Sequence, residues 1–486
     1  MLRLLLRCLP LALVTVAALW LRTHDLARRP MHADEANQAV KTGELLEAGR
    51  YVFDPRDHHG PTLYFSGAAL ARIRGERTLA QLSETTVRLV PAIFGTVSIL
   101  LLAWLAAPLG RWPALAAAAF LALSPPVVYY SRYYVQETLL VTFTLATLLC
   151  GRRWWHSGLS RWALAAGAGA GLMQATKASA PLFLATALLS LLAVRGRARP
   201  TTRRPGRDAL AAVGAALLTA ALLYSSFGTN LAGARDALGT YAHALTRFGA
   251  DAAPTGHEKP WWYYLRLFGW FRDGGLVWHQ AAFSSLALVG GLIALARREA
   301  FLRGVACYGV IIATVFSLFA YKTPWHAIHF VPALAILAAA SLAAIARLRT
   351  GRLVSVAFAL IVTATLFQQT WRTSFLRPAD WRNPYAYVHS SPDVLKYRAL
   401  VDAALTRSPG QPIRVISEEY WPLPWYLRGL PSVGFWISPP DDCDGALIIT
   451  SGAQADAVRA KLRRNYRETF LGLRPGFVCV VFTLEP

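Results

Sequence analysis

The sequence contains little charge, and most of the charge it contains is positive. Only 16% of its 486 residues are charged, whereas about a quarter are charged in soluble proteins. Lysine and arginine number 50 against 27 acidic residues, which gives a net charge of +23. The low charge and a hydrophobic fraction of 55% exclude an ordinary soluble domain. Nucleic acid is excluded as a partner, because the basic residues fall between hydrophobic runs, where membrane topology requires them.

Cysteine is scarce, and a phosphate-binding glycine loop is missing. Five cysteines are too few for a disulfide framework. Cys8, Cys150 and Cys307 lie in apolar runs and are expected to be inert packing residues. Cys443 and Cys479 lie in the C-terminal tail and could pair if that tail faces an oxidising compartment. No glycine-rich phosphate loop follows a strand, which argues against a nucleotide-binding fold.

Long hydrophobic runs fill the first 370 residues. A run of about 17 to 25 apolar residues can cross a bilayer as a helix. The first run lacks a small-x-small cleavage site before Asp25, so we interpret it as an uncleaved helix and not as a signal peptide. The eleven predicted membrane helices are Leu4–Leu21, Thr86–Ala107, Trp112–Tyr130, Gln136–Cys150, Trp162–Ala175, Ser179–Val194, Ala209–Phe227, Gln280–Ala296, Gly304–Ala320, His326–Ala346 and Leu353–Thr370.

The loops between these helices alternate in charge. Basic loops stay on the cytoplasmic side, where they also contact anionic lipid. The arginines of the basic loops are Arg111, Arg152, Arg153, Arg161, Arg195, Arg197, Arg199, Arg203, Arg204, Arg207, Arg297, Arg298, Arg303, Arg347, Arg349 and Arg352. We therefore predict a multi-pass protein of the cytoplasmic (inner) membrane with its N-terminus inside. The loop around Asp34 and the tail from Trp371 then face the periplasm, or the outside.

Two regions outside the membrane have their own predicted structure. In the first outer loop, Asp34–Ala48 and Pro61–Arg74 have helical apolar spacing and are expected to lie along the membrane interface. In the tail, a helix is predicted from Ser391 to Arg407. Further tail elements are predicted as strands at Ile413–Ser417, Val433–Ile437, Ala446–Thr450 and Phe477–Leu484, with a helix at Gln454–Asn465.

This pattern predicts a fold class and two domains. The first domain, 1–370, is an α-helical polytopic membrane domain with about eleven transmembrane helices and amphipathic helices in its first outer loop. The second, 371–486, is a small periplasmic α/β domain, because strands alternate with helices in it. At about 110 residues it could hold its own core.

Asp34 and Glu35 form an adjacent acidic pair just outside the first membrane helix. Acids are favoured at a helix start in any case, because the helix dipole and the free N–H groups stabilise them. A carboxylate beside a second acid can also have its pKa raised enough to act as a general base. We therefore predict catalytic roles for both residues. One of them could instead bind a divalent cation through oxygen.

The turn Tyr129–Glu137, with the sequence YYSRYYVQE, carries a second set of ionisable residues. Such residues at a membrane edge are costly unless they are used. Arg132 could hold a phosphate in a bidentate grip, and Glu137 is predicted to share the catalytic cavity. Alternatively, Arg132 and Glu137 pair with each other at the interface and the tyrosines belong to an aromatic belt.

A third group of candidates lies in late or neighbouring outer turns. In YKTPWHAIHF, Lys322 precedes His326 and His329, which share a helix face at i, i+3 spacing. Cations at headgroup depth would stabilise a phosphate as a leaving group. Lys177 and His59 complete the predicted substrate-binding set. For Lys322 a snorkelling lysine, and for the histidines satisfied interface residues, remain alternatives.

Two further interpretations are weaker. The segment His257–Tyr264, which contains HEKPWWYY, is most simply an interfacial aromatic anchor, although its rings could stack on sugar or lipid. A zinc site built from His32, His58 and His59 has a spacing that matches no common zinc motif.

The motifs resemble the GT-C superfamily of polyprenyl-phosphate-dependent glycosyltransferases, nearest its protein O-mannosyltransferase and lipid A aminoarabinose transferase branch. The resemblance covers roughly residues 1–370 and rests on HADEA at His32–Ala36, SRYYVQE, and the K-T-P-W turn. More narrowly, HADE, HGP at His59–Pro61, KPWWYYL, KTPWH, NPYAYVHSSPD and WPLPWYLRG resemble a bacterial and archaeal group described as "flippase activity-associated". The tail is expected to depart from the outer domains of related transferases.

The resemblance implies an activity and roles for the candidates. It implies inverting transfer of a sugar from a polyprenyl-phosphate donor, undecaprenyl phosphate in a bacterium, to a glycan, lipid or protein acceptor on the outer face. Asp34 corresponds by position to the superfamily's catalytic loop acid, with Glu35 beside it and Glu137 as its usual partner acid. The K-x-P turn implies a place for Lys322 near the lipid phosphate.

Two other functions remain open at this point. A non-enzymatic protein could bind or move lipid-linked glycan, although transporters place ionisable residues at the midplane of repeated halves, and no repeat is visible. The tail could instead be the main binding part, with Trp421–Arg428 as an aromatic surface. We expect that stretch to pack its tryptophans internally.

Overall fold

The computed structural model describes residues 2–57, 59–194, 200–248, 256–297 and 299–485. These residues form two compact units. The first unit contains Met1–His24, Ala48–Ser66 and Arg88–Arg377. The second unit contains Asp25–Glu47, Gly67–Val87 and Pro378–Pro486. Two stretches of the first outer loop therefore group with the tail. The expected domains 1–370 and 371–486 stay a prediction.

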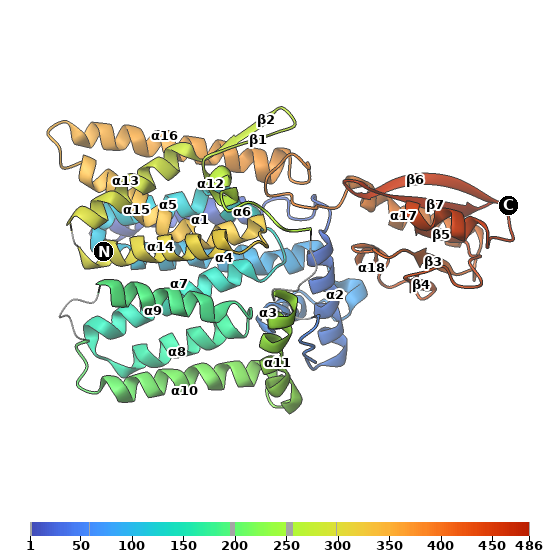
Figure 1. The fold of residues 1–486 in the computed structure, drawn as a ribbon, viewed down its shortest axis with the longest axis horizontal. Coiled ribbons are helices and arrows are strands. Elements are labelled where there is room, and N and C mark those ends of the chain that lie inside the picture. The colour runs from blue at the N-terminus through green and yellow to red at the C-terminus, as the bar shows by residue number, and fades with distance from the viewer. Residues whose placement is uncertain (1, 58, 195–199, 249–255, 298, 486) are drawn as a thin grey trace. The chain divides into compact units, whose positions relative to one another are not determined.

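Each predicted membrane run contains a helix, and the run Trp112–Tyr130 is broken after Leu123 into two helices (Figure 1). The helices are α1 (Leu2–Thr23), α4 (Glu84–Leu105), α5 (Arg111–Leu123), α7 (Glu137–Ser157), α8 (Ser160–Gln174), α9 (Ala180–Val194), α10 (Pro205–Tyr224), α13 (Ala281–Arg297), α14 (Ala300–Leu318), α15 (Val331–Ile345) and α16 (Gly351–Trp371). Among the described residues, four helices are long and apolar enough to cross a membrane: Glu84–Leu105, Pro205–Tyr224, Ala300–Leu318 and Gly351–Leu376. Within the described part of the chain, five further apolar helices are shorter, so eleven crossings stay a prediction.

Shorter elements connect these helices. They are α2 (Ala33–Ala48), α3 (Thr62–Ile73), η1 (Leu79–Gln81), η2 (Ala107–Leu109), α6 (Pro125–Tyr130), α11 (Leu231–Phe248), α12 (Tyr263–Phe268), β1 (Trp270–Asp273), β2 (Leu276–His279), η3 (Pro324–His329) and the π-helix η4 (Arg372–Leu376). The predicted loop helices are therefore present as α2 and α3. Gly49 follows α2 with φ +70°, the left-handed conformation in which glycine ends a helix.

Helix α15 is the centre of one packed group in the first unit. Its sequence, VPALAILAAASLAAI, is apolar on every face, and such a helix is buried by its neighbours. Helices α5, α13, α14 and α16 pack against it. In a second group, α8 packs between α7 and α10. A Cβ at Gly167 would lie 2.1 Å from the carbonyl oxygen of Ala212, so this close helix contact requires glycine.

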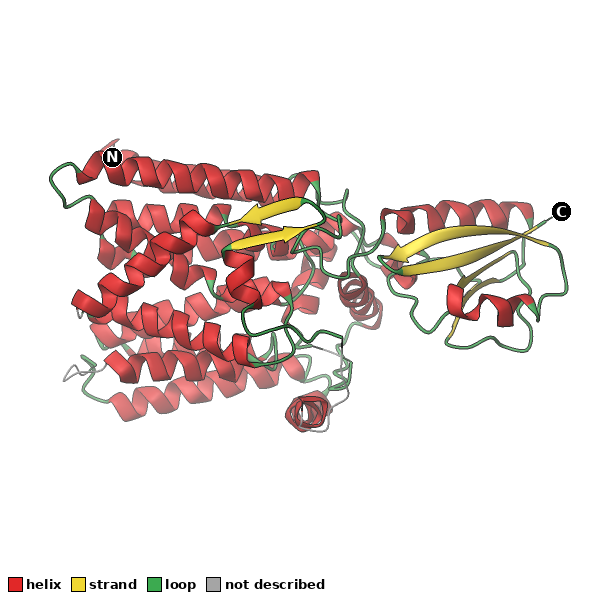
Figure 2. Ribbon diagram, turned by 45° about the horizontal axis from the view of Figure 1, so that its top comes forward, coloured by secondary structure: helices red, strands yellow, loops and turns green. Residues whose placement is uncertain are grey.

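The tail in the second unit folds around a five-stranded sheet with the order β4-β3-β5-β7-β6 (Figure 2). Strand β3 pairs in parallel with β4 and β5, and β7 pairs antiparallel with β5 and β6. The tail elements are η5 (Pro392–Lys396), α17 (Tyr397–Arg407), β3 (Ile413–Ile416), α18 (Leu423–Tyr426), β4 (Val433–Trp436), β5 (Leu447–Ser451), η6 (Gly452–Gln454), α19 (Ala455–Arg459), β6 (Tyr466–Arg474) and β7 (Phe477–Leu484).

Most of the predicted tail elements are confirmed, and two features differ. The helix predicted at Gln454–Asn465 extends only over Ala455–Arg459, and the edge strand Tyr466–Arg474 was missed. That strand forms a hairpin with β7 through the turn at Pro475–Gly476, where Gly476 has φ +78°. The Pro475–Gly476 pair could have revealed this hairpin, because Pro-Gly marks a turn between two strand-like runs.

The two tail cysteines do not pair. Cys443 and Cys479 are both buried free thiols. Cys443 packs in a core cluster with Ile448 and Phe482, while Cys479 lies on β7 opposite Ser451. The disulfide left open by the sequence is therefore absent from this structure.

Candidate active site

In the second unit, the HADEA segment forms the start of α2. The ring Nδ1 of His32 accepts the backbone N–H of Asp34 at 3.0 Å. In return, Oε2 of Glu35 accepts the backbone N–H of His32 at 3.2 Å. This reciprocal arrangement is a capping box with histidine in the place usually held by serine or threonine. It anchors the first turn of the helix and sets the direction in which each acid points.

The adjacent acids have different environments. The side chain of Glu35 is fully buried, and its Oε1 accepts from Nη2 of Arg29 at 2.9 Å. The side chain of Asp34 is 52% exposed, with Oδ2 at 3.8 Å from Nδ1 of His32. Glu35 therefore stabilises the loop, as the helix-start interpretation allows, while the carboxylate of Asp34 is half-exposed. Both catalytic assignments stay predictions.

Residues of the tail hold this loop in place. The hydroxyl of Tyr426 accepts the backbone N–H of Met31 at 2.8 Å. Trp425 is fully buried and donates its indole N–H to Glu84 at 2.8 Å, and Arg428 stacks on its ring at 3.8 Å. The stretch Trp421–Arg428 thus packs Trp425 and Tyr426 internally, as expected. Its supporting role was missed, because pairing over so many residues leaves no local pattern.

His389, from the NPYAYVHSSPD motif, is buried beside the same loop. Its ring centroid lies 5.8 Å from that of His32. Burial lowers the pKa of His389 well below its ordinary value, and the charges of Arg29 and His32 lower it further. The imidazole is therefore neutral in the folded protein at physiological pH.

In the first unit, the buried carboxylate of Glu137 forms an ion pair with the partly buried ammonium of Lys177. Glu137 lies in the first turn of α7, where the dipole favours an acid. Lys177 follows the end of α8, where its backbone N–H donates to the carbonyl of Met173 at 3.1 Å. Two predicted site residues far apart in sequence are thus in contact. Glu137 pairs with this lysine, and the alternative pairing with Arg132 is wrong.

The HGP segment is hydrogen-bonded to the turn that follows α8 and carries Lys177. The N–H of Gly60 donates to the carbonyl of Thr176 at 3.2 Å, and the hydroxyls of Thr62 and Thr176 are 2.8 Å apart. A Cβ on Gly60 would lie 2.2 Å from the carbonyl oxygen of Ala175, so only glycine fits here. His59 is exposed, and its backbone carbonyl accepts from the Tyr51 hydroxyl at 2.9 Å.

The KTPW turn is held by the HEKP segment. The backbone N–H of Lys322 donates to the carbonyl of His257 at 3.0 Å. The ammonium of Lys322 is almost fully buried and donates to the carbonyls of Lys259, at 3.0 Å, and of Phe319. Burial lowers its pKa. The ammonium therefore stabilises the turn, and its predicted contact with a phosphate stays a prediction.

His326 and His329 lie in the 3₁₀ helix η3 and not in the following membrane helix, which begins at Val331. In a 3₁₀ helix, residues three apart eclipse each other, so the two imidazoles share a face. Nδ1 of His326 lies 3.3 Å from Oγ1 of Thr323. The ring of His329 lies 4.5 Å from that of Phe183. Element η3 contacts both α6 and α7, which brings it to the helix that carries Glu137.

The side chain of Arg132 caps the C-terminal end of helix α1. Its Nη1 donates to the carbonyls of Leu21 at 3.0 Å and His24 at 2.6 Å, and its guanidinium stacks on Phe375 at 4.5 Å. The last carbonyls of a helix lack intrahelical partners, and a cation there is favourable. Arg132 thus has a structural role in addition to the predicted phosphate contact.

No group of three or more histidine, cysteine or acidic side chains in the described part of the chain is arranged to hold a metal ion. His58 lies outside the described residues, so the zinc hypothesis is not tested for it. The divalent cation at the acidic pair stays a prediction.

Comparison with known proteins identifies the fold. Residues 68–225 match the family model described as dolichyl-phosphate-mannose-protein mannosyltransferase. No relative was found among the curated proteins. The structure of ArnT from Cupriavidus metallidurans in the apo state matches with a TM-score of 0.67 at 15% identity, over 97% of both chains. The same protein bound to undecaprenyl phosphate gives a TM-score of 0.68 at 15% identity, again over 97% of both chains.

A second, more distant enzyme shares the fold. The oligosaccharyltransferase of Archaeoglobus fulgidus, in its complex with zinc and sulfate, matches with a TM-score of 0.59 at 14% identity, over 96% of this chain and 72% of that one. The ArnT matches include most of the tail, so its expected departure from related transferases is not seen at the level of fold. The chain therefore has the fold of these membrane glycosyltransferases, and its residues 68–225 are similar to the mannosyltransferase family, in agreement with the resemblance predicted from the sequence.

Proposed function

We propose that the chain transfers a sugar, with inversion, from a polyprenyl-phosphate donor to a glycan, lipid or protein acceptor on the outer face of the cytoplasmic membrane. The observation that carries this proposal is the fold shared over 97% of both chains with an ArnT structure that holds undecaprenyl phosphate. The orientation follows from the basic loops, which would put the second unit and Asp34 in the periplasm.

In the proposed reaction, the acceptor hydroxyl or amine attacks the anomeric carbon as the bond to the phosphate oxygen breaks. Asp34 takes the acceptor proton or orients the acceptor, and the polyprenyl phosphate leaves with the bonding electrons. The half-exposed carboxylate of Asp34 supports this role, because the neighbouring acid is already engaged with Arg29.

The donor phosphate needs cations to stabilise it as a leaving group. We propose Arg132, Lys177 and Lys322 for this purpose, with His59, His326 and His329 as further donor contacts. The Glu137–Lys177 pair offers a switchable contact: a phosphate near Lys177 would compete with the carboxylate for the ammonium. Glu137 is then positioned to accept a proton from a bound acceptor.

The test is transfer of labelled sugar from membrane lipid in cells that lack the native copy, comparing the wild type with Asp34→Asn. Asparagine is accepted near a helix start, so the variant should insert and fold. Glu44→Gln is the matched control, because Glu44 is an exposed acid on the same helix. Loss of transfer in Asp34→Asn at unchanged protein level, with transfer kept in the control, supports the proposal. An unchanged glycan profile in Asp34→Asn contradicts it and favours a protein that binds or moves lipid-linked glycan.

A further inference from the structure

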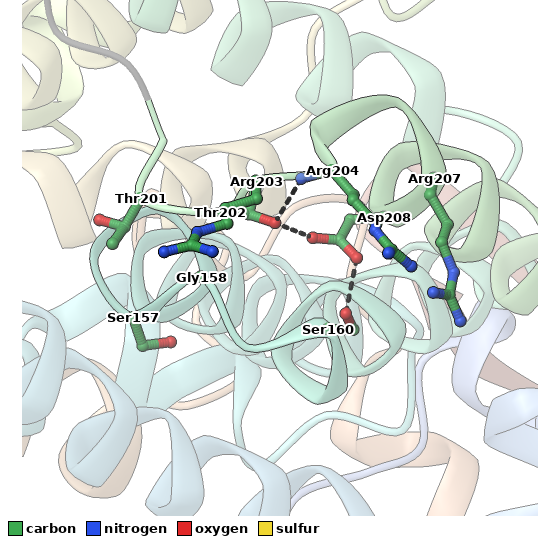
Figure 3. A pocket seen from close by; sticks show the side chains of 9 residues that line it. All are labelled: Ser157, Gly158, Ser160, Thr201, Thr202, Arg203, Arg204, Arg207 and Asp208. Atoms are coloured by element: carbon green, nitrogen blue, oxygen red, sulfur yellow. Dashed lines mark hydrogen bonds between the residues drawn. The ribbon is translucent and has the colours of Figure 1, made fainter.

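A polar hollow of about 300 Å³ lies between the α7–α8 turn and the start of α10 (Figure 3). Its lining includes the hydroxyl residues Ser157, Ser160 and Thr201 and the basic residues Arg203, Arg204 and Arg207. The three arginines are exposed. Clustered guanidinium and hydroxyl donors are the groups that bind a phosphate.

The one acid in this lining, Asp208, is directed into the protein. It is 2% exposed and accepts hydrogen bonds from the Ser160 hydroxyl at 2.6 Å, the Thr202 hydroxyl at 2.7 Å and the Trp154 indole at 2.9 Å. Figure 3 shows the bonds from Ser160 and Thr202. Because its oxygens are engaged by neutral donors, Asp208 holds the loop against the helices. The guanidinium groups of the arginines stay available to a ligand.

The hollow also contains the N-terminus of a 20-residue helix. Helix α10 begins at Pro205 with no side-chain cap at Arg204. Within the described residues, the backbone N–H groups of Gly206 and Arg207 have no acceptor. Nothing lies within 4 Å of the position that a Cβ on Gly206 would occupy. Free N–H groups and the positive end of the helix dipole add to the attraction of an anion.

The neighbouring surface indicates where the anion comes from. Only 6% of the apolar stretch of α10 is buried. Leu210 and Leu217, which follow the hollow along this helix, are 74% and 67% exposed. A soluble phosphate would make no use of such a face, whereas the acyl chains of a lipid would cover it. We propose that the hollow binds the phosphate headgroup of an anionic membrane lipid, with its acyl chains along the exposed side of α10.

This site is separate from the proposed donor site. Glu137 begins α7 and Ser157 ends it, 20 residues later. A helix rises about 1.5 Å per residue, so the two ends lie roughly 30 Å apart, the thickness of a bilayer core. The lipid in the hollow therefore belongs to the leaflet opposite the Glu137–Lys177 pair, and it is not the sugar donor bound there.

The test measures binding of dioleoyl phosphatidylglycerol to the purified full chain by native mass spectrometry in detergent. The variant R203Q/R204Q/R207Q should bind this lipid at least about tenfold more weakly, since each basic residue near a headgroup contributes about fivefold. The control R347Q/R349Q/R352Q removes the same charge from three exposed arginines on the predicted cytoplasmic side, outside the hollow. Its loss of affinity should be much smaller than that of the hollow variant.

Two further measurements separate loss of lipid binding from loss of folding and from binding of free phosphate. Arg207→Gln leaves two of the arginines in place, so it should preserve insertion and thermal stability and still weaken binding several-fold. Millimolar inorganic phosphate should not displace the lipid. Equal losses in the control and in the hollow variant, or no loss in Arg207→Gln and the triple variant, would overturn the proposal. Binding of inorganic phosphate without binding of phosphatidylglycerol would overturn the lipid source.

Discussion

Glu35 and Asp34 are neighbours in sequence, and the structure predicts that their substitution has opposite effects. Glu35→Gln removes the charge of a buried carboxylate that accepts from Arg29 at 2.9 Å and from the N–H of His32. Asp34→Asn changes a side chain that is 52% exposed. We expect the first variant to lose stability and the second to lose transfer while keeping its stability.

The magnitudes follow from burial. Removing one partner of a buried ion pair costs about 3–5 kcal/mol, because the other charge stays buried. At about 2–4 °C per kcal/mol for a unit of 150 to 250 residues, Glu35→Gln should lower the unfolding temperature of the second unit by about 6–20 °C. A substitution on the exposed surface changes stability by about 0.5 kcal/mol or less, so Asp34→Asn should shift that temperature by at most about 2 °C.

The assay is thermal unfolding of the purified full chain in detergent, followed by tryptophan fluorescence, beside sugar transfer in membranes. Because heating of membrane proteins is often irreversible, one scan rate is used for all variants. The double variant R29M/E35L replaces both charges with apolar groups and should recover part of the loss. If Glu35→Gln keeps its unfolding temperature and loses transfer, the buried carboxylate takes part in the chemistry and the division of roles argued above is wrong.

Three further outcomes can be measured. The folded state keeps His389 neutral, while the unfolded state binds a proton near pH 6.5. The free energy of unfolding should therefore fall below that pH by up to about 1.4 kcal/mol per pH unit. His389→Gln should flatten this fall in thermal melts between pH 5 and 8, and an unchanged slope would refute the assignment. Trp425→Phe removes the indole donor to Glu84 and should cost about 1–3 kcal/mol in the same melts, whereas an unchanged melt would mean that the contact is dispensable. Burial raises the pKa of Cys479 to about 11, so maleimide should label it only after unfolding, and rapid labelling of the native protein would contradict its burial.

The sequence by itself determined the elements of this protein. Long apolar runs separated by arginines predicted the eleven long apolar helices, because hydrophobicity and helix length are local properties, whereas α11 and α12 were not predicted. HADEA predicted the start of α2, and Gly49 its end, since caps are written in a few neighbouring residues. Four of the five tail strands were found in the same way. Strand β6 was missed because it lies at the edge of the sheet, where charged and exposed residues interrupt the alternation of apolar and polar positions.

The tertiary structure decided what the site residues do. Local pattern could not separate Asp34 from Glu35, because their exposure depends on Arg29 and on tail residues packed around the loop. Nor could it show that Glu137 pairs with Lys177, 40 residues away. Such pairings are made by the packing of elements that are distant along the chain. The role of such a residue can therefore be assigned only when its neighbours in the folded structure are known.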